Sequence, residues 1–325
     1  HHKIADERWT RLPMRPDRDP ETRFLFPPST GATLNLAATA AQCARIWREI
    51  DAAFSARCLA AAERAWAAAR RNPQAFPIGN FTGSGGYGDV DFGDEFYWAA
   101  AELFATTGRD EYAQALRASP WFAAPVTVHG WPRTGTLGTM TLAMVPNRLP
   151  ERDRQALRRR LVAAAEGFVA DSARVGYHIP FAPPAYTWGS NSDILNRAMI
   201  LGLAHDFTGE ARFRAGMVDA MDYILGRNPL DRSFVSGYGA RPMRNPHHRF
   251  WAHSMDPAYP PPPPGALSGG PNNTAMSDDV ARVMRGTCAP QTCWVDDIRA
   301  FSLNEVAVNW NAPLVWVAAY LAEPD

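Results

Sequence analysis

The fold class is decided by residues 32–73, which read ATLNLAATAAQCARIWREIDAAFSARCLAAAERAWAAARRNP. The apolar residues of the first half recur at helical spacing: Leu34, Ala37, Ala38, Ala41, Ile46, Trp47 and Ile50. Asp51 is a suitable N-cap for a second helix, which we expect to run to about Arg71 and to end before Asn72-Pro73. The stretch therefore predicts two consecutive helices joined by a short turn.

Working outward from this pair, helical patterns recur along most of the chain. The segment EFYWAAAELFATTG should form a helix closed by Gly108, and further patterns lie near 109–117, 135–146, 150–174, 190–207, 210–227 and 302–323. Residues 4–30 are polar and Pro-rich, which indicates an extended segment, and 228–275 show little periodicity. No alternating strand pattern of useful length is present. We expect an all-α toroid or solenoid of helix hairpins, with long loops forming a binding face.

The composition excludes several classes of protein. The 325 residues carry 33 basic and 33 acidic side chains, and 46% of them are hydrophobic, so general disorder is excluded. The zero net charge argues against a nucleic-acid partner. No run of about 18 apolar residues exists, so we expect no membrane span. Eleven Trp residues fit equally well a large core and a cleft in which flat rings stack on sugars.

The four cysteines fall into two pairs. Cys43 and Cys58 lie in Ala-rich helical sequence and are interpreted as buried small hydrophobes rather than as a bridge. Cys288 and Cys293 flank a Pro-containing loop that could fold back and join them as a disulfide. No second Cys/His pair lies nearby, which disfavours zinc. A short disulfide fits a secreted or periplasmic protein. The N-terminus shows no signal peptide. A mature or truncated product would look the same.

An acidic cluster follows the Gly-rich loop GSGGYG at 83–88. The loop lacks the Lys-Ser/Thr of a phosphate-binding loop, so nucleotide binding is disfavoured. Asp89, Asp91, Asp94 and Glu95 offer oxygen ligands on a tight loop at a helix start. They predict a Ca²⁺ site with Asp94 and Glu95 as the side-chain ligands and backbone carbonyls completing the shell. The alternative is that Asp94 and Glu95 only compensate the helix N-terminus.

Two further groups are candidates for chemistry. His247, His248 and Arg249 lie in the long loop, and His247 and Arg249 would project to one side of an extended segment. Glu305 lies in NEVAVNWNAPLVW, among apolar residues at helical spacing. Such surroundings raise the pKa of a carboxyl group, which suits a general acid near neutral pH. A structural Glu paired with an Arg is the rival interpretation.

Taken together, these segments resemble glycoside hydrolase family 9, the inverting cellulases. GRNPLDRSFVSGYGARPMRNPHHR (226–249) and WVDDIRAFSLNEVAVNWNA (294–312) match two family signatures, and further matches are PPST-x-ATLNLAATAA (27–41), DEFYWAAAEL (94–103), WGSNSDILN (188–196) and PPPPPGALSGGPN (260–272). The resemblance covers essentially the whole chain as one domain, 1–325. It implies an (α/α)6 barrel, hydrolysis of β-1,4-glucan by single displacement with inversion, and no organic cofactor.

The resemblance also implies residue roles. Glu305 would protonate the leaving oxygen, and Asp296 would shape the hydrogen bonding and charge of the site without acting as the base. His247 and Arg249 would bind hydroxyls of the sugar beside the scissile bond. Trp188 is the best candidate for a stacking platform, with a core Trp as the equal alternative.

One departure from the family pattern concerns the base. The Asp-Ala-Gly-Asp motif that carries it is absent, so we expect the chain to be the C-terminal two-thirds to three-quarters of an incomplete barrel. The missing N-terminal segment would then be a partner of this chain. The alternatives are a non-catalytic carbohydrate-binding relative and an exo-acting glucosidase or glucosaminidase on short oligosaccharides.

The last helical pattern supports the same expectation. It is apolar on several faces, through Val306, Val308, Trp310, Leu314, Val315, Trp316, Val317 and Leu321. A helix of this kind is normally buried, and its exposure costs roughly 25 cal/mol per Å². We therefore expect poor folding of the 325 residues alone and contact with a further segment.

Overall fold

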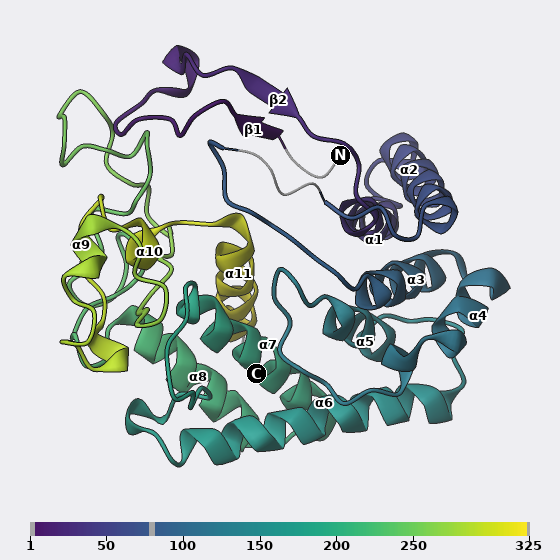
Figure 1. Cartoon of the computed structure of the whole chain (residues 1–325). Coiled ribbons are helices and arrows are strands. Elements are labelled where there is room, and N and C mark those ends of the chain that lie inside the picture. Colours follow the sequence, from purple (N-terminus) through teal and green to yellow (C-terminus); the bar gives the residue numbers. More distant parts are fainter. Residues whose placement is uncertain (1–3, 78–81, 324–325) are drawn as a thin grey trace. The chain divides into compact units, whose positions relative to one another are not determined.

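The computed structural model describes residues 4–77 and 82–323, and the chain divides into two compact units (Figure 1). Unit 1 comprises His1–Thr10 and Pro20–Leu161, and unit 2 comprises Arg11–Asp19 and Val162–Asp325. Helices are the main regular secondary structure of both units, so the predicted all-α class is confirmed. No helix among the described residues is long and apolar enough to cross a membrane.

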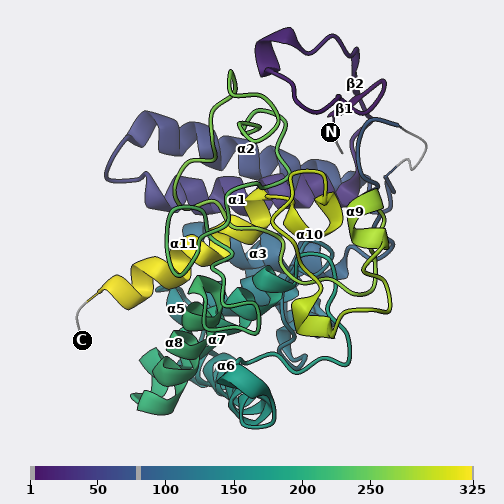
Figure 2. The same cartoon turned by 90° about the vertical axis from the view of Figure 1, so that its left-hand side faces the viewer.

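Unit 1 is built on helix α3 (Gly93–Thr107), which packs against α1, α4 and α5. The remaining bounds are α1 Thr30–Ile46, α2 Ala52–Arg71, α4 Asp110–Ala118, η2 Pro120–Phe122 and α5 Gly135–Met144. Helices α1 and α2 form an antiparallel hairpin and lie side by side (Figure 1, Figure 2). The side chain of Asp51 caps α2, as predicted. Gly108 ends α3 with φ +67°, a left-handed conformation that glycine adopts without strain.

A short β-ladder lies in the segment that the sequence indicates as extended. Strand β1 (Ile4–Asp6) pairs antiparallel with β2 (Arg23–Leu25), with Ala5 opposite Phe24. Each strand has three residues, too few for an alternating pattern to be recognised in the sequence. Residues 11–19 between them include the 3-10 turn η1 (Pro16–Arg18) and belong to unit 2.

Unit 2 is centred on α7 (Ser190–Thr208), which packs against both α8 (Ala211–Leu225) and α11 (Val308–Ala322). The shorter elements are η3 Gly176–His178, α9 Asp279–Arg282, η4 Pro290–Thr292 and α10 Phe301–Asn304. Helix α6 (Glu151–Ser172) begins in unit 1 and ends in unit 2. Residues 226–278 contain no helix or named strand, as their sequence indicates, although Phe234, Met243 and Leu267 are buried.

The last predicted helix is wrong in one respect. A helix was expected over 302–323 without interruption, but α10 ends at Asn304 and α11 begins at Val308. Glu305 is extended, with φ −62° and ψ 151°, and pairs with His247 in an isolated parallel bridge. Contacts with the distant His247 segment therefore replace the local helical pattern. In α11, Val308 and Val315 are 89% and 68% exposed, while Val317 is buried.

One cysteine pair is as predicted, and the other, Cys43 and Cys58, is less buried than predicted. Cys288 and Cys293 form a disulfide with Cα atoms 5.3 Å apart, which confirms the predicted bridge. Cys43 and Cys58 are free thiols, as interpreted, but both are only half-buried. They face each other across the α1–α2 hairpin, so they are not simply small core residues.

Candidate active site

Three segments far apart in the sequence meet at Glu305. The backbone N–H of His247 donates to the carbonyl oxygen of Asn304 at 2.8 Å, and the N–H of Gly269 donates to the carbonyl of Glu305 at 2.8 Å. The N–H of Asn191, in the first turn of α7, donates to the carbonyl of Gly269 at 3.0 Å. The segments 188–196, 226–249, 260–272 and 294–312, each conspicuous in the sequence, thus contribute to one site in unit 2.

The carboxyl group of Glu305 is partly buried and accepts one hydrogen bond from a side chain. Trp188 Nε1–H donates to Oε2 of Glu305 at 3.2 Å. Burial raises the pKa of Glu305, while the Trp188 hydrogen bond and the positive charge of Arg249 oppose the rise. A carboxyl group with a raised pKa carries its proton closer to neutral pH and can act there as an acid. Glu305 therefore has the electrostatics that the sequence predicts.

His247 is fixed in one tautomer. Its Nδ1 lies 2.7 Å from the carbonyl oxygen of Ile298, and a carbonyl only accepts, so Nδ1 carries a proton. Burial lowers the pKa of His247, and the nearby charge of Arg249 lowers it further, so the neutral form dominates near pH 7. In that form Nε2 bears a lone pair that can accept a hydrogen bond from a hydroxyl group.

The backbone around Arg249 is held from two directions. Nδ1 of His248 accepts hydrogen bonds from the N–H groups of Phe250 and Trp251, at 3.3 and 3.1 Å, and the His248 ring stacks on Trp251. The N–H of Met14 donates to the carbonyl of Arg249 at 3.0 Å. Arg249 acts electrostatically on both Glu305 and His247, as a residue of the same site would.

Asp296 positions the loop that carries His247. Its side chain is only 8% exposed and accepts hydrogen bonds from the backbone N–H groups of Arg244 and Asn245, the shortest at 2.7 Å. The guanidinium of Arg232 adds an ion pair at 3.2 Å. The carboxylate is thus occupied by donors from the chain itself, and its expected influence on the hydrogen bonding and charge of the site stays a prediction.

Two glycines allow the segments to approach. Gly189 has φ +83°, and a Cβ there would lie 2.8 Å from the ring of Trp310. Gly270 has φ +97°, and a Cβ there would lie 2.4 Å from the amide of Asn191. Any larger residue at either position would separate the start of α7 from the Glu305 segment. The ring of Trp188 lies against Phe301 at 5.8 Å between centroids.

Several residues of this site are not indicated by the sequence patterns. Asn304 donates through Nδ2 to the carbonyl of Asn245, which joins the Glu305 segment to the His247 loop. Asp278 is buried and accepts the N–H of Ser302 at 2.9 Å. Both act through long-range hydrogen bonds, and only their place beside the candidate residues could have suggested them.

The first turn of α3 in unit 1 carries Asp94 and Glu95, and both residues are buried. Oδ2 of Asp94 accepts the N–H of Thr134 at 2.6 Å, whereas Oε2 of Glu95 is buried without a hydrogen-bond partner. Burial raises the pKa of Glu95 to about 9, and the neighbouring Asp94 and Asp89 add to the effect. The described residues contain no cluster of three or more His, Cys, Asp or Glu side chains arranged for a metal.

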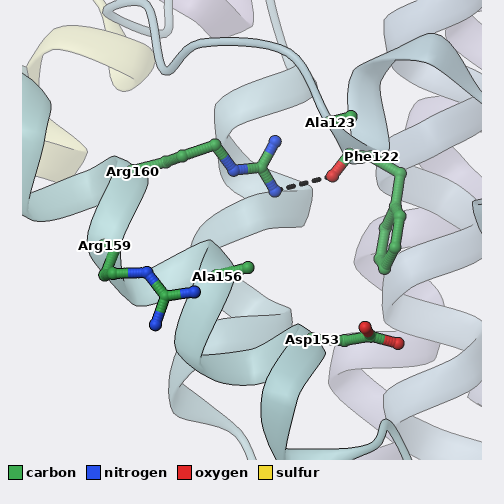
Figure 3. Close-up of a pocket in the computed structure, with 6 residues that line it drawn as sticks. All are labelled: Phe122, Ala123, Asp153, Ala156, Arg159 and Arg160. Atoms are coloured by element: carbon green, nitrogen blue, oxygen red, sulfur yellow. Dashed lines mark hydrogen bonds between the residues drawn. The ribbon is translucent and has the colours of Figure 1, made fainter.

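Unit 1 also contains a shallow cavity and an exposed aromatic pair. The cavity measures about 440 Å³ and is lined by Phe122, Ala123, Asp153, Ala156, Arg159 and Arg160, none of them a predicted site residue (Figure 3). Arg160 is engaged there by the carbonyls of Phe122 and Ala124. Elsewhere in the unit, Tyr87 and Trp131 are 54% and 51% exposed and lie edge to face at 5.7 Å. Both residues lie in loops that contain Gly or Pro.

The profile of Glycosyl hydrolase family 9 matches residues 1–318. A cellulose 1,4-beta-cellobiosidase of Acetivibrio thermocellus is 44% identical over all of this chain and 39% of its own length. Endoglucanase C of Cellulomonas fimi is 43% identical over 99% of this chain and 30% of its own length. The chain thus spans well under half of either relative.

A solved structure shows the same fold. The crystal structure of a metagenome-derived glycoside hydrolase family 9 endoglucanase matches with a TM-score of 0.88 and 32% identity, over 99% of this chain and 57% of that one. Such endoglucanases are (α/α)6 barrels, which confirms the expected fold class. From its sequence and its fold alike, the chain belongs to glycosyl hydrolase family 9.

Proposed function

We propose that the chain forms part of an inverting glycoside hydrolase that cleaves β-1,4-glycosidic bonds in cellulose or a related β-glucan. The observation that carries the proposal is the half-buried Glu305, whose pKa is raised by burial and whose Oε2 accepts the indole N–H of Trp188. The names of the two relatives, a cellobiosidase and an endoglucanase, support a β-1,4-glucan substrate. Acid–base hydrolysis by two carboxyl groups and water needs no organic cofactor.

In the proposed mechanism Glu305 donates its proton to the leaving oxygen of the scissile bond. The carboxylate that remains is stabilised by the Trp188 N–H and by the charge of Arg249, both already in place before the reaction. Nε2 of neutral His247 and the guanidinium of Arg249 bind hydroxyl groups of the sugar beside that bond. The Trp188 side chain already has one role, the N–H donation to Glu305. Stacking of a sugar on the face of its ring stays a prediction.

We assign the base to a carboxylate outside these 325 residues, which is supported by the chain's coverage of only 39% and 30% of its two relatives. An inverting enzyme holds its two carboxyl groups about 6.5–9.5 Å apart, with the attacking water between them. Asp296 is unsuited to this task because its oxygens accept the N–H groups of Arg244 and Asn245. The partner of this chain would be a further segment of the same protein, which would also cover the exposed Val308 and Val315.

A Ca²⁺ site in unit 1 is the second part of the proposal. Asp94 and Glu95 supply carboxylate oxygens, and the buried Oε2 of Glu95, which has no hydrogen-bond partner, is suited to a cation. The bound ion would hold both carboxyl groups in their ionised form and would join the loop before α3 to the first turn of that helix. Its role would be structural.

We also propose that the protein works outside the cytoplasm, secreted or periplasmic. A disulfide such as Cys288–Cys293 forms and persists in oxidising compartments, and a polymeric glucan substrate has to be met outside the cell. Location of the natural protein in culture supernatant or periplasm, against a cytoplasmic marker enzyme, tests this.

The decisive experiment compares this chain with the same chain preceded by its natural upstream segment. On soluble carboxymethylcellulose, the longer protein should release reducing ends and the 325 residues alone should not. NMR of the first product should show the α-anomer, the result of inversion at a β-bond. Glucan binding without turnover by the longer protein would instead support the non-catalytic carbohydrate-binding alternative.

The same assay separates endo from exo action. The names of the two relatives do not decide between them, since one is a cellobiosidase and the other an endoglucanase. A fast fall in viscosity with few reducing ends indicates internal cleavage. Release of short sugars without that fall indicates exo action, and activity on glucosamine oligomers tests the amino-sugar alternative.

A further inference from the structure

The hairpin of α1 and α2 brings two cysteines together. Cys43 lies in the last turn of α1 and Cys58 in the second turn of α2. Their Sγ atoms are 2.6 Å apart, with one thiol donating a hydrogen bond to the other. A disulfide bond is about 2.05 Å long, so the two sulfurs need to approach by only about 0.6 Å to be joined.

The backbone around these residues is already fixed by the turn between the helices. The N–H of Trp47 donates to the carbonyl of Cys43 at 3.0 Å, and the N–H of Asp51 donates to the carbonyl of Trp47 at 2.9 Å. Oγ of Ser55 donates to the carbonyl of Ala44 at 2.6 Å, which joins the two helices beside the sulfur pair. The close approach of the thiols is therefore a property of the folded hairpin.

We propose that Cys43 and Cys58 are a second disulfide site, which oxidation closes to lock the α1–α2 hairpin. Both residues are half-buried rather than enclosed, so a small oxidant reaches them. The same chain already contains the Cys288–Cys293 disulfide, which indicates an oxidising environment for the protein. The bridge would close a loop of 15 residues and restrict the unfolded chain.

The reaction balances with a small-molecule disulfide, such as oxidised glutathione, as the oxidant. The thiolate of one cysteine attacks a sulfur of the oxidant, breaks its S–S bond, and releases one thiolate. The second cysteine then loses its proton and attacks the mixed disulfide, which forms the Cys43–Cys58 bond and releases the second thiolate. The protein loses two protons and two electrons, and the oxidant is reduced to two thiols.

The rate of closure should depend on pH. The hydrogen bond with Cys58, and then burial, raise the pKa of the Cys43 thiol to about 11. Only the thiolate attacks a disulfide, so closure is expected to be slow at neutral pH and faster at pH 8 to 9.

Peptide mapping tests the proposal directly on the folded protein that includes the proposed upstream segment. After oxidation at pH 8 the remaining thiols are blocked, and the protein is digested with trypsin. Cys43 then lies in peptide 24–45 and Cys58 in peptide 58–64, whereas Cys288 and Cys293 share peptide 286–299. The bridge predicts a joined species of peptides 24–45 and 58–64 that reductant separates. Cys288–Cys293 serves as an internal reference because it links no two peptides.

The matched controls are the single variants Cys43→Ala and Cys58→Ala, which should give no joined species. Full blocking of both cysteines in the oxidised, folded wild type would overturn the proposal, as would glutathione attached at both positions. Oxidation should also raise the thermal midpoint of the wild type by roughly 5 °C and leave that of Cys43→Ala unchanged. An equal response in the two proteins would show that the hairpin is not locked.

Discussion

The indole Nε1 of Trp188 donates a hydrogen bond to Oε2 of Glu305 over 3.2 Å, although 117 residues separate the two in sequence. The donor opposes the rise in the pKa of Glu305 that burial causes. It also lies where negative charge appears once the acid has given up its proton. The pair therefore sets both the working pH of the proposed acid and the stability of its product form.

Replacing Trp188 with Phe should shift the alkaline limb of the pH–activity profile upward. The ring is kept but the N–H is lost, so burial acts with less opposition and the pKa of Glu305 rises. A general acid works when protonated, so activity should persist to higher pH. The measurement is kcat/KM against pH in the full-length enzyme. Trp316→Phe is the control, because that ring stacks on Tyr320 instead. A downward or absent shift would contradict the assigned hydrogen bond.

Glu305→Gln should abolish turnover of cellulose, by about 100- to 10,000-fold, because the amide cannot donate the catalytic proton. A substrate with a very acidic phenol as leaving group needs no such proton and should be cleaved with a much smaller loss. More than about a tenth of parent activity on cellulose would remove Glu305 from the acid role. Equal losses on both substrates would point to misfolding or lost binding.

The same variant should not be less stable at neutral pH. The folded-state pKa of Glu305 is raised, so its stabilising contribution is full below its ordinary value of 4.5 and is lost as pH rises through the folded value. A neutral amide does not ionise, so the variant does not lose stability in this way as the pH rises. The thermal midpoint of Glu305→Gln at pH 7 to 8 should therefore equal or exceed that of the parent.

Asp296→Asn should lower kcat/KM about 10- to 100-fold by loosening the loop that carries His247 and Arg249. The amide keeps one acceptor oxygen but presents N–H atoms to the donors of Arg244 or Asn245. Azide distinguishes this role from that of a base, since this small anion can attack the sugar in place of water and needs no base to deprotonate it. No azide rescue is expected. Rescue with a glycosyl azide product would make Asp296 the base.

The parts of the fold that depend on local sequence could be predicted. The N-cap Asp51 and the closing Gly108 define their helix ends by hydrogen bonds and backbone angles within a few residues, and both were identified correctly. The helix across Glu305 was predicted wrongly because periodicity cannot report a partner 58 residues away. His247 pairs with Glu305 in a bridge, and that pairing ends the local helix.

The sequence is enough to propose the candidate site residues, but it does not reveal most of their contacts. The raised pKa of Glu305 follows from its apolar neighbours, and the segments that meet there were recognised one by one. The sequence predicts Trp188 as a stacking platform for a sugar, with a core Trp as the alternative, and neither use involves its N–H. Its N–H donation to Glu305 depends on the turn at Gly189, where the positive φ and the close fit to Trp310 both favour glycine.

Added calcium should raise the thermal midpoint of the chain, and a chelator should reverse the effect. The reason is that Ca²⁺ bound by Asp94 and Glu95 stabilises only the folded state, which alone brings the two carboxyl groups into a buried place. At a concentration about 100 times the dissociation constant, the gain is about 2.7 kcal/mol. Glu95→Gln should fold but lose this response. Asp110→Asn, an acidic residue in the first turn of α4 outside this loop, should keep it. Calorimetry that finds no calcium-dependent shift in the parent, or the same shift in Glu95→Gln, would exclude Glu95 as a ligand.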